Sequence, residues 1–232
     1  MPTRTGTLYS VALPIGNSAD ITERAKAVLA SVDFIACEDT RKALDLFRRA
    51  AIATKARLLV HNPFHEAQSA EGLLKLLRDG QNVALISDAG TPRLSDPGSR
   101  VLRLAFMEKI PVVPVPGAAA LTALLSVTPF SIDPFLFLGF LSPKSTRRQN
   151  ELKKYQEFEG AVALYESVHR IEKCIVDIQS VFPHAEILIG RELTKTHEEL
   201  FWGTTAEAAA WVKGKHGEFA LIFRKNKLNG TH

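Results

Sequence analysis

Residues 85–99 read LISDAGTPRLSDPGS, and this stretch decides the fold. The apolar run 83–86 ends abruptly in polar and turn-forming residues, namely Ser87, Asp88, Gly90 and Pro92. A second turn sequence, Asp-Pro-Gly at 96–98, then leads into a helical pattern of apolar residues. In open α/β sheets, ligands bind where the carboxyl end of a parallel strand passes into a helix. We therefore predict an α/β domain with a ligand-binding loop after this strand.

Four more strand-like runs alternate with helical patterns in the first half of the chain. They are TLYSVAL (7–13), DFIAC (33–37), RLLVH (57–61) and PVVPV (111–115). Such an alternation predicts right-handed crossovers and a mostly parallel sheet with helices on both faces. We expect this first domain to span residues 1–130.

The second half has a different organisation. The segment TPFSIDP (128–134) has two prolines and no periodicity, so we expect a linker there, a second α/β domain at 135–226 and a short tail at 227–232. The strand-like runs 187–193 and 197–202 are joined without a helix, which predicts a mixed sheet. Helical spacing over 171–182 predicts a buried, inert thiol at Cys174, and Thr204 with Glu207 has the spacing of a capping box.

Composition narrows the class of protein. With 232 residues, 46% of them hydrophobic and 23% charged, the chain fits two ordinary globular domains. Two cysteines, Cys37 and Cys174, are too few for a disulfide framework and favour a reducing cytoplasm. His61 and His65 lack a third ligand, so we expect no metal site. No apolar stretch reaches membrane-spanning length, so we expect a cytoplasmic protein that makes no membrane contact.

The loops after the strands at 83–86 and 111–115 suit a zwitterionic, hydroxylated ligand. Gly90 lets backbone amides approach a ligand, and Asp88 can accept hydrogen bonds from an ammonium or from hydroxyls. We expect Pro116 and Gly117 to open a helix whose free N–H groups face a carboxylate. The P-loop and dinucleotide-binding motifs are missing from the sequence, which disfavours a phosphate ligand. Plain tight turns are the alternative for either loop taken alone.

Two charged clusters have two interpretations each. In CEDTR (37–41), either Asp39 or Thr40 caps the next helix, or Glu38 or Arg41 has a catalytic role. RELTKT (191–196) would place Arg191, Leu193 and Lys195 on one face of a strand, where the cations either bind a phosphate or form a solvated edge.

A third charged segment, KSTRRQNELKK (144–154), is predominantly basic. It sets five cations against the single acid Glu151; these are Lys144, Arg147, Arg148, Lys153 and Lys154. Such a face would contact nucleic-acid phosphates without regard to sequence, and a solvated helix surface is the alternative.

An ordered set of motifs identifies a family. The chain resembles the small-subunit ribosomal RNA methyltransferases of the tetrapyrrole methylase superfamily from about residue 8 to residue 223. The motifs that carry this resemblance are, in order, LPIGNSADIT, ACEDTR, ISDAGTP, DPG, VPVPGAAALTAL, GFL, YESVHR and RELTKTHEE. The resemblance implies two α/β domains with S-adenosylmethionine in the cleft between them. It also implies methylation of a cytidine ribose 2′-hydroxyl in the decoding centre of 16S rRNA, with the 30S ribosomal subunit as partner and a homodimer as the assembly.

The resemblance also implies roles for individual residues. The methionine and ribose end of the cofactor would be lined by Asp88, Ala89, Gly90, Thr91, Pro116, Gly117, Ala118 and Thr122. The adenine side would be formed by Leu164, Tyr165, Glu166 and Leu193, with Gly217 and Glu218 as further candidates. The acceptor side would hold Glu38, Arg41, Arg191 and Lys195, with Glu38 as the base and Arg41 and Lys195 on RNA phosphates.

Two other functions compete with this one. A tetrapyrrole-precursor methyltransferase would keep the cofactor and change the acceptor, and a noncatalytic ribosome-binding factor would have lost the activity. Members of the family commonly continue with a small helical C-terminal domain, whereas NKLNGTH follows Lys225 here. The resemblance therefore does not extend to that part of an RNA docking surface.

Overall fold

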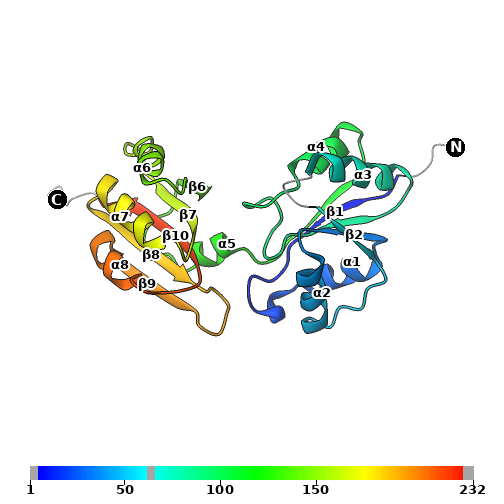
Figure 1. Cartoon of the computed structure of the whole chain (residues 1–232), viewed down its shortest axis with the longest axis horizontal. Coiled ribbons are helices and arrows are strands. Elements are labelled where there is room, and N and C mark those ends of the chain that lie inside the picture. Colours follow the sequence, from blue (N-terminus) through cyan, green and yellow to red (C-terminus); the bar gives the residue numbers. More distant parts are fainter. Residues whose placement is uncertain (1–4, 62–65, 227–232) are drawn as a thin grey trace. The chain divides into compact units, whose positions relative to one another are not determined.

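The structure is a computed structural model that describes residues 5–61 and 66–226. The chain divides into two compact units, the first ending at Ala119 and the second beginning at Ala120 (Figure 1). His65 and the expected tail at 227–232 lie outside the described residues.

The first unit contains a five-stranded sheet in the order β3-β2-β4-β1-β5. Its strands are β1 (Leu8–Val11), β2 (Phe34–Cys37), β3 (Arg57–Val60), β4 (Val83–Leu85) and β5 (Val112–Val115). Every neighbouring pair is parallel, which confirms the predicted parallel sheet. Because all strands run the same way, the loops that follow β2, β4 and β5 gather at one edge of the sheet.

Helices cover both faces of this sheet. After a short 3-10 turn, η1 (Ser18–Asp20), helices α1 (Glu23–Ser31) and α2 (Thr40–Arg49) lie on one face, and α3 (Glu66–Arg78) and α4 (Ser99–Met107) lie on the other (Figure 1). Each pair buries its own apolar cluster against the strands. Leu29 and Phe47 belong to the first cluster, and Leu74 and Val101 belong to the second. Burial of side chains of this size stabilises the fold by roughly 1.5–3 kcal/mol each.

The second unit contains a mixed sheet in the order β6-β7-β10-β8-β9. Its strands are β6 (Phe135–Phe140), β7 (Ala161–Ser167), β8 (Ala185–Arg191), β9 (Glu199–Thr204) and β10 (Glu218–Lys225). Only β6 and β7 pair in parallel, which confirms the predicted mixed sheet. The predicted strand limits 187–193 and 197–202 were wrong, because β8 ends at Arg191 and β9 begins at Glu199.

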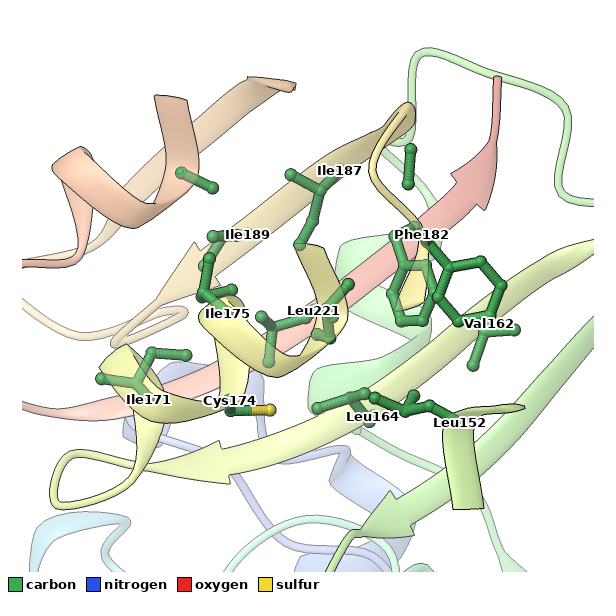
Figure 2. Close-up of a cluster of buried hydrophobic side chains, with 14 of the residues drawn as sticks. Leu152, Val162, Leu164, Ile171, Cys174, Ile175, Phe182, Ile187, Ile189 and Leu221 are labelled. Atoms are coloured by element: carbon green, nitrogen blue, oxygen red, sulfur yellow. The ribbon is translucent and has the colours of Figure 1, made fainter. Parts of the chain in front are cut away.

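Helices α6 (Ser145–Lys153), α7 (Ile171–Val181) and α8 (Thr205–Trp211) pack over one face of this sheet. Figure 2 shows the core beneath them, where Ile171, Cys174 and Ile175 of α7 contact strand residues such as Ile189 and Leu221. Cys174 is fully buried, as predicted, and burial raises the pKa of its thiol. Thr204 and Glu207 form the predicted capping box. Within the described residues, no helix is both long and apolar enough to cross a membrane.

Helix α5 (Ala120–Leu125) belongs to the second unit. It packs against β10 and β8, and the Leu121 N–H donates to the Tyr165 hydroxyl at 2.9 Å. The structural division therefore falls before this helix, whereas the sequence placed the end of the first domain after it, at residue 130. The prediction that Pro116 and Gly117 open the helix was wrong, because residues 116–119 form an irregular segment.

Candidate functional site

Three loops of the first unit are tied together at the carboxyl edge of its sheet. Leu13 and Gly90 exchange backbone hydrogen bonds, from the Leu13 N–H to the Gly90 carbonyl at 2.8 Å and from the Gly90 N–H to the Leu13 carbonyl at 3.1 Å. The Thr91 hydroxyl donates to the Ala118 carbonyl at 3.1 Å. The structure thus brings together two groups of predicted cofactor residues, Asp88–Thr91 and Pro116–Ala118.

Glycines keep the surface of these loops open. Gly90 adopts φ +73°, a left-handed conformation that favours glycine, and a Cβ there would lie 3.2 Å from Ile15 Cγ2. A Cβ on Gly117 would lie 3.0 Å from Ala12 Cβ, which is tighter than ordinary contact. Side chains at these two positions would crowd the loops, so backbone atoms line this part of the edge.

Carboxylates gather at the same edge. Asp88 Oδ2 accepts a hydrogen bond from Lys42 Nζ at 2.6 Å. Burial and the nearby Asp88 charge raise the pKa of Glu38, while the Asp88 backbone N–H donates to that carboxylate and partly opposes the shift. Burial, assisted by the charges of Glu38 and Asp88, raises the pKa of Asp96 to about 6. The sequence did not predict Asp96 as a site residue, although its Asp-Pro-Gly turn lies between β4 and α4, just before α4 begins.

The residues after Glu38 start a helix. Asp39 caps α2 by accepting from the Arg41 N–H at 2.9 Å, which confirms the capping interpretation. The Arg41 guanidinium donates two hydrogen bonds to the same carboxylate, from Nε at 3.1 Å and from Nη2 at 2.8 Å. These hydrogen bonds lower the pKa of Asp39 to about 2. Arg41 itself is exposed, with 89% of its side-chain surface accessible.

In the second unit, the strand register places Tyr165 and Leu193 on one surface. Tyr165 of β7, Ala220 of β10 and Gly190 of β8 are successive partners across the sheet and therefore share a face. Leu193 covers Gly190, since a Cβ on that glycine would lie 2.8 Å from Leu193 Cδ2. Helix α5, which carries Thr122, contacts the same strands and the Tyr165 hydroxyl.

Leu164 and Glu166 point away from that surface. Both are 1% exposed, and Leu164 packs in the core under α7 (Figure 2). The Glu166 carboxylate pairs with Arg170 at 2.6 Å and accepts from the Ser167 N–H at 2.8 Å. Their alternation with Tyr165 along β7 accounts for this placement, because successive strand residues point to opposite faces.

The turn after β8 holds two of the predicted acceptor-side cations. Glu192 and Thr194 adopt φ +51° and +67°, so the chain leaves the strand at Arg191 and the predicted single face for Arg191, Leu193 and Lys195 was wrong. Lys195 Nζ lies 3.0 Å from Glu192 Oε1 and 3.0 Å from Glu218 Oε2. Arg191 Nη1 lies 2.9 Å from Glu199 Oε2. Both cations are thus held by carboxylates.

A pocket of about 510 Å³ opens elsewhere in the second unit. Its lining includes residues around the starts of β7 and β8, such as Phe158, Phe182 and His184, together with Lys225 at the end of β10. Tyr165 lies toward the other end of β7, so this pocket is separate from the predicted cofactor residues.

Comparison with known proteins places the chain in a family. Residues 7–209 match the family model for tetrapyrrole (corrin/porphyrin) methylases. The chain belongs to the tetrapyrrole methylase family. The family resemblance read from its motifs is therefore confirmed.

Two curated relatives of this tetrapyrrole methylase match nearly the whole of this chain. The ribosomal RNA small subunit methyltransferase I of Leptospira biflexa is 43% identical over 229 residues, which cover 97% of this chain and 95% of the relative. The protein of the same name from Escherichia coli O157:H7 is 42% identical over 227 residues, which cover 96% of this chain and 79% of the relative.

The fold of this tetrapyrrole methylase is shared with distant solved structures. A uroporphyrin-III C-methyltransferase from Thermus thermophilus, complexed with S-adenosyl homocysteine, superposes with a TM-score of 0.67 at 16% identity. The superposition covers 95% of this chain and 98% of that one. At this identity the likeness establishes the fold alone, and it confirms the predicted pair of α/β units.

The predicted site residues of this tetrapyrrole methylase fall into groups. The first unit clusters Asp88–Thr91 and Pro116–Ala118 with Glu38 near Asp88, and Asp96, which was not predicted, lies near the same two acids. The second unit places Tyr165 and Leu193 on one sheet face and sets Lys195 against Glu218, beside Gly217. Among the described residues, no cluster of three or more His, Cys, Asp or Glu side chains could hold a metal ion.

Proposed function

We propose that this protein is an S-adenosylmethionine-dependent methyltransferase that methylates the ribose 2′-hydroxyl of a decoding-centre cytidine in 16S rRNA of the 30S subunit. The observation that carries this is an identity of 42–43%, over nearly the whole chain, with relatives named ribosomal RNA small subunit methyltransferase I. We further propose that it acts in the cytoplasm and as a homodimer, as the family resemblance implies.

The chemistry of the clustered loops fits the cofactor. Asp88 offers a carboxylate, 29% exposed, that can accept from an ammonium or from ribose hydroxyls. The backbone-lined surface at Gly90 and Gly117, which a Cβ would crowd, leaves amides and carbonyls accessible for polar groups of a ligand. The face around Tyr165 and Leu193 offers apolar surface for a purine. When bound, S-adenosylmethionine supplies an electrophilic methyl group on a sulfonium sulfur.

The ribose hydroxyl must lose its proton during transfer, and Asp96 is suited to accept it. A carboxyl with a pKa of about 6 is ionised at neutral pH yet is a stronger base than an ordinary aspartate. Glu38, the base expected from the sequence, contributes negative charge that helps to raise the pKa of Asp96. We assign the proton acceptor to this pair, with Asp96 as the member that takes the proton.

The cations are suited to hold the RNA. Burial alone would lower the pKa of Lys195, but its hydrogen bonds to Glu192 and Glu218 outweigh that effect and raise it. Lys195 therefore stays charged at neutral pH and suits contact with a phosphate better than proton transfer. Arg41 is exposed, and Arg191 lies next to the Lys195 turn, so both are candidates for further phosphate contacts.

The test is transfer of label from S-adenosylmethionine to RNA. The protein is incubated with radiolabelled cofactor and with 30S subunits that lack the ribose methyl group, and nuclease fragments are mapped by mass spectrometry. Label on a decoding-centre cytidine ribose supports the proposal. Retained cofactor binding with no label on the subunits would overturn the acceptor assignment, and tetrapyrrole precursors would then be tried as acceptors.

A further inference from the structure

Helix α6 carries most of a basic segment that the fold divides into two parts. Arg148 is 1% exposed, and its Nε donates to Asp177 Oδ2 of α7 at 2.7 Å. The sequence grouped Arg148 with a phosphate-binding face, and this was wrong because its charge is neutralised inside the unit. The four other cations are exposed: Lys144, Arg147, Lys153 and Lys154.

These four cations lie on the solvent-exposed part of α6 and its two caps, where Arg147 and Lys154 share one side and Lys144 and Lys153 flank them. Arg147 and Lys154 are separated by two helical turns, and the uncharged Asn150 lies between them on the same side. With a rise of ~1.5 Å per residue, the stretch from Lys144 to Lys154 spans about 15 Å. A strand of nucleic acid places several phosphates within that length.

Neither Asp177 nor Glu151, the two carboxylates that α6 contacts or carries, forms an ion pair with these four cations. The Asp177 carboxylate accepts hydrogen bonds from Arg148, from the Ser145 hydroxyl at 2.7 Å and from Gln149 Nε2 at 2.7 Å. Glu151 Oε2 accepts from the Ser142 N–H at 3.2 Å. No ion pair forms at the four exposed cations with any described residue, whereas Lys42 and Arg170 in other parts of the chain are paired.

Helix stability accounts for Lys153 and Lys154, which lie at the C-terminal end of α6 where the helix dipole favours cations, but not for the cations at its start. Lys144 is the N-cap residue, its side chain makes no capping hydrogen bond, and the first turn of α6 contains no acid. Cations near a helix N-terminus are repelled by the positive end of the helix dipole. The buried Arg148–Asp177 pair meanwhile fixes the helix to its unit. The result is a helix that is fixed to its unit by a buried ion pair and presents mainly positive charge to the solvent.

We propose that the α6 face, defined as Lys144, Arg147, Lys153 and Lys154, docks the phosphate backbone of the RNA substrate. This inference rests on the proposed function and adds to it a surface that none of the site residues above includes. Contacts of this kind position an RNA without recognising its bases, and each one releases a counterion, so binding depends steeply on salt. The occupant is RNA because a chain of phosphates complements four exposed cations that are distributed along about 15 Å of helix.

The test compares two variants with the same change in charge. The first replaces all four residues of the α6 face by glutamine. The control replaces four exposed cations of the first unit by glutamine, namely Arg24, Lys55, Lys75 and Arg103. Affinity for 30S subunits is measured from about 50 to 200 mM salt, the range over which phosphate contacts dominate. Cofactor affinity and the rate at saturating subunits are measured in parallel.

We expect the affinity of the α6 variant for 30S subunits to be at least about tenfold lower than that of the wild type. A plot of the logarithm of the binding constant against the logarithm of salt concentration should be less steep by about three units, at ~0.7 per lost phosphate contact. Its cofactor affinity and its rate at saturating subunits should match those of the wild type. Equal losses in both variants, or no loss in the α6 variant, would overturn the proposal. It would also be overturned if the α6 variant lost only its binding to anionic lipid vesicles, which would assign the face to a membrane.

The two proposals fail in different ways. If the wild type binds 30S subunits through the α6 face and transfers no methyl group to them, the proposed activity fails while the docking surface stands. If methyl transfer occurs and the two variants bind alike, the activity stands and the docking surface fails.

Discussion

Lys42 Nζ lies 2.6 Å from Asp88 Oδ2, so an ion pair joins α2 to the loop after β4. The Lys42 side chain is 63% exposed and that of Asp88 is 29% exposed. Ion pairs in such surroundings contribute about 0–1 kcal/mol to stability. The pair holds the Asp88 carboxylate in place at the edge of the sheet, and the fold does not depend on it.

Asp88→Ala should therefore impair ligand binding and leave the fold intact. A lost hydrogen bond from a charged group costs roughly 1.5–3 kcal/mol, so we expect S-adenosylmethionine affinity to fall about 10- to 100-fold in isothermal titration calorimetry. The melting temperature should change by only a few degrees. Lys42→Gln, which keeps the carboxylate, is the control and should stay within about fivefold of the wild type. Wild-type affinity for S-adenosylmethionine in Asp88→Ala would mean that the cofactor does not bind at this loop.

Gly117→Trp should block the same loops. A Cβ on Gly117 already approaches Ala12 Cβ to 3.0 Å, and an indole would occupy the adjacent open surface. Overpacking costs about 1–3 kcal/mol of folding stability, so the protein should still fold. Because the indole would cover the loop surface that binds the ligand, we expect cofactor affinity to fall about tenfold or more. Gly72→Trp is the matched control, because a Cβ on Gly72 meets nothing within 4 Å. Equal affinities in the two variants would contradict this assignment.

Asp96→Asn should change the pH dependence of stability. The pKa of this carboxyl is about 6 in the folded protein, above its ordinary value of 3.8. The folded state therefore favours the protonated form of Asp96. Its contribution to stability is fully present below the pKa of the unfolded chain and is lost as pH rises through about 6. Because the amide does not ionise, the variant does not lose this stabilisation. In urea denaturation, its free energy of unfolding relative to that of the wild type should therefore rise between about pH 4 and 8. A constant difference across that range would refute the shift.

The same aspartate should control the rate of methyl transfer. If Asp96 accepts the proton, the wild-type rate should fall as pH drops below about 6, and Asp96→Asn should remove most of the rate. Glu38→Gln removes a neighbouring negative charge, so the acidic limb of the rate profile should move to lower pH. An unmoved limb in Glu38→Gln would show that the two carboxyls do not interact. Both profiles are measured at saturating cofactor and subunits.

Arg148→Ala should destabilise the second unit severely. Removal of the guanidinium leaves Asp177 buried without its cation, which costs about 3–5 kcal/mol. Arg147→Ala, one position earlier on the exposed side of α6, should change the free energy of unfolding by no more than about 0.5 kcal/mol. Urea denaturation of both variants measures the contrast. Similar losses would mean that Arg148 is not the buried partner of Asp177.

The sequence predicted the features that depend on neighbouring residues. Alternating apolar runs and helical patterns indicated the parallel sheet of the first unit, and three- and four-residue spacing indicated that Cys174 is buried. Asp39 and the Thr204–Glu207 pair act within a single helical turn, so their capping roles could be read from spacing. The order of the motifs identified the family.

Features that depend on distant residues were decided only by the tertiary structure. The strand was expected to continue past Arg191, but the chain turns there while the Glu192 carboxylate accepts from the Glu218 N–H, 26 positions along. Arg148 is buried because Asp177, 29 positions away, lies opposite it on α7. The pKa of Asp96 depends on burial and on Glu38, which follows β2, whereas Asp96 lies between β4 and α4.

The sequence by itself determined which elements form and which family they belong to, because periodicity, caps and motif order are local properties of the chain. Only the tertiary structure decided which charges are buried, paired or left exposed. The physical reason is that the energy of a charge depends on the groups and solvent around it, and folding brings most of those groups from remote parts of the sequence.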